Sequence, residues 1–210
     1  MVVFLQRIHY TICEVINMSK ELEIEFKNML TQEEFQLLVD KYFFNTPAFS
    51  QTNCYFDTSK NELKEKSMGL RLRKRDGKNE CTLKIPTADE HTYQEVTDNL
   101  TNHQMDQLIK NQQIFKDGDV GLTLRQLGIS IENLHMIGSL TTYRREKRIN
   151  NPTLLVLDES HFGQTTDFEL EMEVQNSDKG NMFFNDFLIN EGIKRRPASK
   201  KIARMIEYQS

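Results

Sequence analysis

The 210-residue chain lacks several features that mark common classes of function. It has no tryptophan, and its three cysteines, Cys13, Cys54 and Cys81, form no Cys-x-x-Cys spacing. The five histidines form no His-x-x-x-His spacing, and the nine glycines form no Walker-type phosphate loop. These absences argue against a disulfide framework, a zinc site and a P-loop enzyme. They indicate a reducing compartment, so we expect a cytoplasmic protein.

The chain also lacks an excess of basic residues. It has 27 lysines and arginines against 31 aspartates and glutamates, which gives a formal net charge of −4. General nucleic-acid binding relies on a basic excess, so we do not expect it here. A hydrophobic content of 38% and a charged content of 28% are typical of a globular domain with its own core. We expect a monomer or a homodimer.

Residues 1–17 differ from the rest of the chain. They are apolar but interrupted by charged side chains, and they are too short for a transmembrane helix. They also lack the basic start and small-residue cleavage site of a signal peptide. Met18 is a candidate natural start, which would make residues 1–17 a leader from gene-start assignment. The alternative is an added strand or helix that docks on a single domain, residues 18–210, with no membrane association.

Several segments alternate charged and apolar residues with the period of a β-strand. Residues 21–27 read Glu-Leu-Glu-Ile-Glu-Phe-Lys, so one face carries three carboxylates and an ammonium group. Residues 168–174 repeat the acidic pattern, whereas residues 70–73 place two arginines on one face. A solvated surface normally mixes the two signs of charge. Like carboxylates along one strand repel each other, so either water screens them or they hold a cation.

This arrangement of charge predicts two binding surfaces that face one cavity. Acidic strands lie near both ends of the chain, and basic strands lie between them, with Lys84 adding an ammonium group in residues 82–85. An acidic surface suits a hard divalent metal ion, and a basic surface suits a polyanion.

The remaining patterns predict seven or eight strands, mostly antiparallel because their connections are short. A capping box at Thr31 and Glu34 starts the first helix, and Asp76-Gly77 predicts a hairpin. A closed barrel would remove the sheet edges. If helices cover its outside, the apolar faces point outward and the charged faces line a hydrophilic tunnel. The predicted fold class is therefore α+β, with an antiparallel β-barrel inside a layer of helices.

The ordered set of charged motifs resembles the CYTH domain family, also called the triphosphate tunnel metalloenzymes. The family signature Glu-x-Glu-x-Lys is matched by Glu23-Ile-Glu25-Phe-Lys27, and the resemblance extends from about Lys20 to Tyr208. It includes the motifs Arg71-Leu-Arg73, Leu83-Lys84-Ile85-Pro86, Tyr143-Arg144-Arg145, Leu157-Asp158-Glu159 and Lys201-Ile202-Ala203-Arg204. The chain is most similar to the small single-domain bacterial branch. The resemblance implies an eight-stranded antiparallel tunnel that binds a triphosphate group and one or two Mg²⁺ or Mn²⁺ ions.

The resemblance also implies roles for individual side chains. It implies catalytic roles for Glu23, Glu25, Lys27 and Glu171. It implies metal ligands among the carboxylates of Glu23, Glu25, Asp158, Glu169, Glu171 and Glu173. It implies triphosphate contacts from Lys27, Arg71, Arg73, Lys84, Arg144, Arg148 and Lys201. Carboxylate oxygens suit Mg²⁺ and Mn²⁺, and guanidinium groups suit phosphate oxygens.

Three of these assignments have alternatives. Lys27 either contacts a phosphate oxygen or forms a plain salt bridge with its neighbours. Arg144 and Arg145 are adjacent on one strand, so only one of them can face the interior. Lys200 competes with Lys201, because the alignment of the tail can shift by one residue.

The function that we expect is a metal-dependent triphosphatase that hydrolyses inorganic tripolyphosphate or a related small triphosphate. One alternative is an adenylyl cyclase of the class IV type, which would convert ATP to cyclic AMP and pyrophosphate. A second is a non-catalytic protein that binds polyphosphate or a nucleotide. The acidic strands favour catalysis, because a pure anion sensor gains nothing from six inward carboxylates. The remaining alternative is an α+β domain whose charged sheet faces are only solvated.

Overall fold

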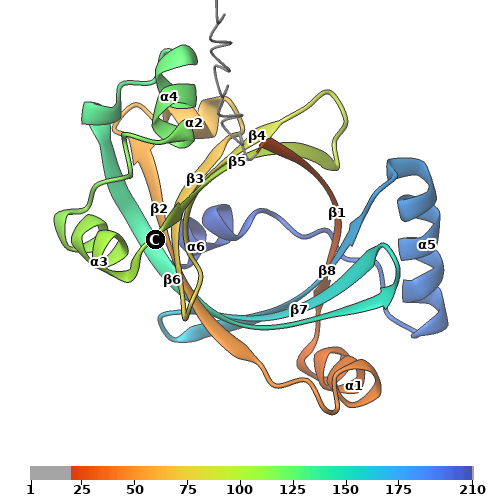
Figure 1. The fold of residues 1–210 in the computed structure, drawn as a ribbon. Coiled ribbons are helices and arrows are strands. Elements are labelled where there is room, and N and C mark those ends of the chain that lie inside the picture. Colours follow the sequence, from red (N-terminus) through yellow and green to blue (C-terminus); the bar gives the residue numbers. More distant parts are fainter. Residues whose placement is uncertain (1–19, 210) are drawn as a thin grey trace, which may run out of the picture.

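The computed structural model describes residues 20–209, so the predicted leader and Met18 lie outside the described residues. Its eight strands are β1 Lys20–Leu30, β2 Phe49–Thr58, β3 Gly69–Arg75, β4 Asn79–Pro86, β5 Thr92–Leu100, β6 Leu134–Asn150, β7 Thr153–Phe162 and β8 Thr165–Val174. They form a closed antiparallel barrel in the order β1-β5-β4-β3-β2-β6-β7-β8 (Figure 1). The predicted eight-stranded barrel is confirmed.

Six α-helices accompany the barrel. They are α1 Gln32–Tyr42, α2 Glu62–Glu65, α3 Asn102–Asn111, α4 Asp119–Gln126, α5 Ser177–Asn190 and α6 Lys201–Gln209. The predicted capping box starts α1, because Thr31 Oγ1 accepts from the Glu34 backbone N–H at 3.2 Å and the Glu34 carboxylate accepts from the Thr31 N–H at 2.9 Å. Within residues 20–209, none of these helices is long and apolar enough to cross a lipid bilayer.

Two hydrophobic cores lie outside the barrel wall, between the strands and the helices. In the first, α2, α3 and α4 pack on strands β2 to β5, and in the second, α1 and α5 pack on β1, β7 and β8 (Figure 1). Leu70 and Leu72 of β3 are fully buried in the first core, whereas Arg71 between them lines the interior. The strand period therefore turns apolar side chains outward and charged ones inward, as the sequence predicts.

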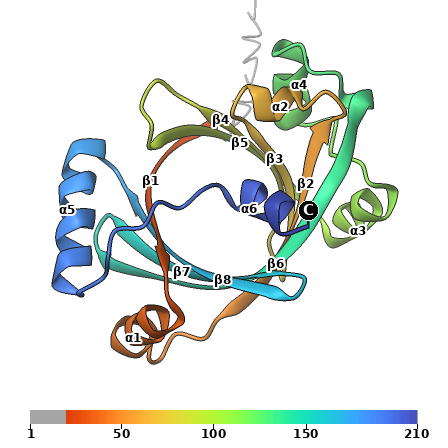
Figure 2. The same ribbon diagram turned by 180° about the vertical axis from the view of Figure 1, so that it is seen from behind.

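The C-terminal helix α6 differs from the other five, because it lies across one end of the barrel (Figure 2). Met205 of α6 is fully buried against Tyr55, Leu140 and Phe162 at that end. The predicted outer layer of helices is thus found for α1 to α5, and α6 instead closes one end of the tunnel.

The buried side chain of Asn28 fixes the segment that leads into α6. Its amide nitrogen donates to the backbone oxygen of Lys194 at 3.0 Å, and its amide oxygen accepts from the backbone N–H of Arg196 at 2.6 Å. The backbone N–H of Met29 also donates to the Arg196 oxygen at 3.2 Å. These bonds hold the segment against β1, so that α6 begins next to the barrel end.

A candidate site in the charged tunnel

The inward faces of the strands line a cavity with a volume of about 780 Å³. All of the site residues predicted from the sequence line it except Asp158 and Glu169, which are completely buried behind Lys201. Glu25, Arg73 and Glu171, which come from distant segments, therefore face one interior. The predicted juxtaposition of opposite charges is present in the structure.

Strand register explains how the acidic residues meet. β1 pairs with β8 so that Glu25 lies opposite Glu173 and Lys27 lies opposite Glu171. β7 pairs with β8 so that Asp158 lies opposite Glu169. We call the resulting set the acidic wall, and it consists of Glu23, Glu25, Asp158, Glu169, Glu171 and Glu173.

Glu171 lies at the centre of the acidic wall. Its carboxylate contacts Lys27 Nζ at 3.1 Å, the Arg144 guanidinium at 2.8 Å and Lys201 Nζ at 2.7 Å. Burial raises the pKa of Glu171, but these three cations outweigh burial and bring the pKa well below its ordinary value. Glu171 is therefore a carboxylate ion that the protein itself neutralises.

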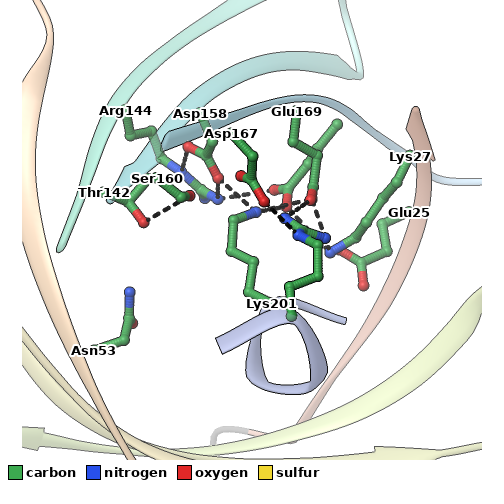
Figure 3. A network of polar contacts seen from close by, with 12 residues as sticks. Glu25, Lys27, Asn53, Thr142, Arg144, Asp158, Ser160, Asp167, Glu169 and Lys201 are labelled. Atoms are coloured by element: carbon green, nitrogen blue, oxygen red, sulfur yellow. Dashed lines mark hydrogen bonds and ion pairs between the residues drawn. The ribbon is translucent and has the colours of Figure 1, made fainter. Parts of the chain in front are cut away.

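Lys201 enters this network from α6. Its Nζ lies 2.8 Å from Asp158 and 2.8 Å from Glu169, in addition to its contact with Glu171 (Figure 3). Burial lowers the pKa of Lys201, but these carboxylates raise it above its ordinary value. Lys200, the alternative, donates instead to the backbone oxygen of Ser67 at 2.6 Å. The structure thus brings Lys201 rather than Lys200 to the acidic wall.

Arg144 and Arg204 complete the internal cations on this side. Arg144 binds Asp158 with two hydrogen bonds of 2.7 and 2.6 Å, and it faces inward, while Arg145 lies outside near the ring of Phe35. Arg204 of α6 is buried, binds Asp167 at 2.7 Å and also contacts Glu169. α6 therefore supplies two of the cations that balance the buried carboxylates.

Glu23 and Glu25 share the ammonium group of Lys84, which contacts both carboxylates. Burial and the neighbouring charge of Glu25 raise the pKa of Glu23 to about 7. Burial also raises the pKa of Glu25, but Lys27 and Lys84 outweigh burial and lower it to about 2. The two pKa values separate because Glu25 contacts a second ammonium group, Lys27, at 3.0 Å.

Arg71 and Arg73 of β3 form what we call the cationic wall. Arg73 Nε donates to Asn53 at 3.0 Å, and its guanidinium contacts Glu80 at 3.1 Å. Among residues 20–209, the ion-pair partner of Arg71 is Glu95, at 3.9 Å, and its buried Nε has no hydrogen-bond partner. Burial and the like charges of Arg71 and Arg144 lower the pKa of Arg73 to about 10. Burial also lowers the pKa of Arg71, but the charge of Glu95 and other negative groups raises it above its ordinary value. Arg71 keeps a donor without a partner and Arg73 lies beside like charges, so this wall is suited to an anion.

The structure also identifies site residues that the sequence analysis missed. Glu95 of β5 lines the cavity 3.8 Å from Lys84, and its buried Oε1 has no hydrogen-bond partner in the described part of the chain. Glu80 lines the cavity beside Arg73. In the sequence, the parity of Glu95 within β5 is the one signal for its inward orientation, and the neighbouring polar residues of that strand obscure it. Of the predicted residues, Arg148 is exposed at the rim and donates to the Pro152 oxygen at 3.1 Å.

The acidic wall has donors of the right kind for a divalent metal, because carboxylate oxygens suit Mg²⁺ and Mn²⁺. Burial and the charges of Glu171 and Glu25 raise the pKa of Glu173, which forms no ion pair with any described residue. Within residues 20–209, however, no group of three or more His, Cys, Asp or Glu side chains is arranged to hold a metal ion. The donor chemistry therefore fits a metal, while lysine and arginine side chains hold most of the donor oxygens.

Comparisons with known proteins agree with this geometry. Residues 21–206 match the model of the CYTH domain. The chain is 36% identical over 193 residues to YjbK of Bacillus subtilis (strain 168), named as a candidate triphosphatase, with 90% of this chain and 97% of the relative covered.

Two solved structures are similar as well. A Bacillus halodurans protein described as a candidate adenylate cyclase has a TM-score of 0.82 and 31% identity, over 89% of this chain and 98% of that one. HpAC1 from Hippeastrum, a candidate adenylyl cyclase described as having a dominant triphosphatase activity, has a TM-score of 0.74 over 89% of this chain and 95% of that one. Its 21% identity supports a shared fold alone.

Proposed function

This chain belongs to the CYTH domain family, and from that premise we propose that it is a metal-dependent triphosphatase acting on inorganic tripolyphosphate or a related small triphosphate. One observation carries the proposal: a cationic wall short of anions faces a wall of carboxylates across a cavity of about 780 Å³. Phosphoryl transfer needs little more than positioning and neutralisation of negative charge.

The cationic wall would bind the substrate. Arg71 and Arg73 present planar guanidinium groups that match phosphate oxygens in pairs, and Lys84 adds a point charge beside them. Arg71 has an unpaired buried Nε, so a phosphate oxygen would satisfy a group that the free protein leaves unsatisfied. Arg73 lies beside the like charges of Arg71 and Arg144, so a bound phosphate would also offset the repulsion among these guanidinium groups.

The acidic wall would hold Mg²⁺ or Mn²⁺ through Glu23, Glu25, Glu171 and Glu173. When bound, the metal supplies Lewis-acid polarisation of the phosphate oxygens. A glutamate of this wall would orient the attacking water toward the terminal phosphorus. The water oxygen would form a bond to the terminal phosphorus as the anhydride bond breaks, and the products are orthophosphate and a shortened polyphosphate.

The aromatic residues of the cavity favour a small triphosphate over ATP. Among the lining residues, the aromatic rings are those of Tyr55 and Tyr93. Tyr55 is buried against Leu140 in the cluster at the closed end, and Tyr93 lies beneath Lys84 at 4.5 Å and Lys200 at 5.2 Å. Tyr55 is therefore buried, and the Tyr93 ring already contacts two ammonium groups, so the cavity has little free aromatic surface for stacking an adenine base. A cyclase needs such recognition, whereas tripolyphosphate does not.

The test is a substrate panel with the purified full chain and either Mg²⁺ or Mn²⁺. We expect orthophosphate release from tripolyphosphate and loss of that release after chelation of the metal. Cyclic AMP and pyrophosphate from ATP would instead support a cyclase. Tight binding of tripolyphosphate without turnover would indicate a non-catalytic binding protein. Either result would overturn the proposal.

A further inference from the structure

Two ammonium groups of the protein together hold an oxygen of five of the six acidic-wall carboxylates. Lys201 Nζ lies within 2.8 Å of Asp158, Glu169 and Glu171, and Lys84 contacts both Glu23 and Glu25. Of the six carboxylates, Glu173 is the one without an ion pair to a described residue. The two lysines thus act as internal counter-ions for the other five.

An ammonium group of the protein and a divalent metal ion compete for the same carboxylate oxygens, so each weakens the binding of the other. Mg²⁺ binds oxygen at about 2.0–2.1 Å and keeps a near-octahedral shell. A metal bound to Glu171 would therefore lie within a few ångströms of Lys201 Nζ, which is itself 2.7 Å from that carboxylate. Two cations at that separation repel strongly inside a partly dry tunnel. Metal binding requires the ammonium groups to withdraw.

Lys84 lies between the acidic wall and the cationic wall, so an ammonium group that leaves Glu23 and Glu25 could move toward an anion bound by Arg71. It is on β4, directly opposite Gly69 of β3, and Arg71 follows two residues later on that strand. Its side chain also lies 3.8 Å from Glu95, which is the carboxylate nearest to Arg71. Lysine has a flexible four-carbon stem, so its ammonium group can exchange one oxygen partner for another. A phosphate bound by Arg71 would offer new oxygens beside the old ones.

We infer that Lys84 and Lys201 keep the acidic wall closed to metal ions until a polyanion binds the cationic wall and draws these ammonium groups away. Binding of the anion then raises the affinity for the metal ion, and the anion binds first. The inference rests on the proposed function in taking this anion to be a polyphosphate. The coupling also means that metal tightens the hold on the anion, because such coupling is reciprocal.

The experiment measures Mn²⁺ binding to the full chain without any polyphosphate, from the electron paramagnetic resonance signal of free Mn²⁺. We expect weak binding by the wild type and tighter binding by Lys84→Gln and by Lys201→Gln. The gain should be about 10-fold or more, within the range of roughly 5–150-fold typical of coupled sites. Two variants are used because loss of Lys201 also removes buried ion pairs. Each is accepted only if its thermal unfolding is cooperative.

The matched control is Arg73→Gln, which removes one positive charge from the same cavity. Arg73 pairs with Asn53 and Glu80 and holds none of the acidic-wall oxygens. A general electrostatic effect would raise Mn²⁺ affinity in this variant as well, whereas the inferred mechanism predicts a much smaller change. Lys74→Gln, which breaks an exposed ion pair with Asp106, should leave Mn²⁺ affinity unchanged.

Two results would overturn the inference. One is wild-type Mn²⁺ binding as tight as that of both lysine variants, and the other is an equal gain in Arg73→Gln. These results are independent of phosphate release. A chain that hydrolyses tripolyphosphate but binds Mn²⁺ tightly on its own would refute only the inference. A chain with the expected Mn²⁺ pattern but no phosphate release would refute only the proposed function.

Discussion

The two walls of the tunnel differ in how closely their charged side chains are paired with opposite charges. On the acidic wall, Glu171 has three internal cations, and Asp158 is bound by Arg144 and Lys201. On the cationic wall, Arg71 has one distant carboxylate at 3.9 Å and an unpaired Nε. The free protein thus pairs five of the six acidic-wall carboxylates closely with cations, whereas Arg71 keeps a donor without a partner. On the proposed function, the anion site is preorganised, whereas a bound metal ion would have to displace internal cations from the acidic wall.

This difference in pairing predicts that substitutions on the two walls affect different properties, stability on one wall and binding on the other. Removing one partner of a buried ion pair leaves an uncompensated charge and is strongly destabilising. Removing a charge from a group of like charges relieves repulsion instead. Substitutions on the acidic side should therefore reduce the free energy of unfolding, and substitutions on the cationic wall should mainly reduce binding. The following predictions test this contrast, beginning with the largest expected effect.

Arg144→Ala should reduce the free energy of unfolding by about 3–5 kcal/mol, because it leaves Asp158 buried with one cation fewer. Urea unfolding of the variant and the wild type measures this loss. The control is Lys74→Ala, which breaks an exposed ion pair and should change stability by about 0–1 kcal/mol. Equal effects of the two substitutions would contradict the contrast between the walls.

Glu171→Gln should lower metal-dependent kcat by about 100-fold, the scale at which single charge-stabilising groups act. The glutamine retains the shape of the side chain but loses the charge at the centre of the acidic wall. Tripolyphosphate binding, measured by calorimetry without metal, should not weaken, because a negative charge has been removed. A variant with unchanged kcat would show that Glu171 is not part of the metal site.

Arg71→Ala should weaken tripolyphosphate binding by about 1.5–3 kcal/mol, which is the usual contribution of a hydrogen bond to a charged group. Its free energy of unfolding should fall far less than that of Arg144→Ala, because the ion pair of Arg71 with Glu95 is long, at 3.9 Å. Calorimetric titration and urea unfolding measure the two quantities. Arg71→Lys should recover part of the affinity. If Arg71→Ala unfolded at a lower urea concentration but bound tripolyphosphate as tightly as the wild type, Arg71 would have a structural role instead of a binding role.

The pH dependence of stability should differ between two neighbours on β1. The pKa of Glu25 is lowered to about 2, so its contribution is present above pH 4.5 and is lost as the pH falls toward 2. The pKa of Glu23 is raised to about 7, so the protein should lose stability as the pH rises from 4.5 to 7.

Urea midpoints across this pH range measure both effects. Each should be on the order of 1–2 kcal/mol, because water reaches this end of the tunnel. Glu25→Gln should flatten only the acid limb, and Glu23→Gln should flatten only the limb between pH 4.5 and 7. If both substitutions flatten the same limb, the two carboxylates do not differ as the structure indicates.

Much of the fold follows from local patterns that the sequence displays. The alternation in residues 21–27 fixes which side chains of β1 share a face, and Asp76-Gly77 marks the hairpin between β3 and β4. The inward orientation of Arg71 and the outward orientation of Leu70 follow from the same parity. These features are predictable because a strand reverses the direction of its side chains at each residue.

The partners of these side chains were not predictable in the same way. Nothing near Asp158 in the sequence indicates that Lys201, at the start of the C-terminal helix α6, would neutralise it. Arg204 and Asp167 meet for the same reason, through the docking of α6. Glu95 was hidden because a single carboxylate in a mixed polar strand carries no distinctive pattern. Long-range pairing depends on register and helix docking, which local periodicity does not encode.

The sequence by itself determined that this protein has charged strand faces of opposite sign, because side-chain parity is a property of each strand alone. Only the tertiary structure decided that the acidic face meets lysines of the same chain while Arg71 keeps a donor without a partner. Barrel closure and the placement of α6 set those distances, and charge compensation depends on distance rather than on order along the chain.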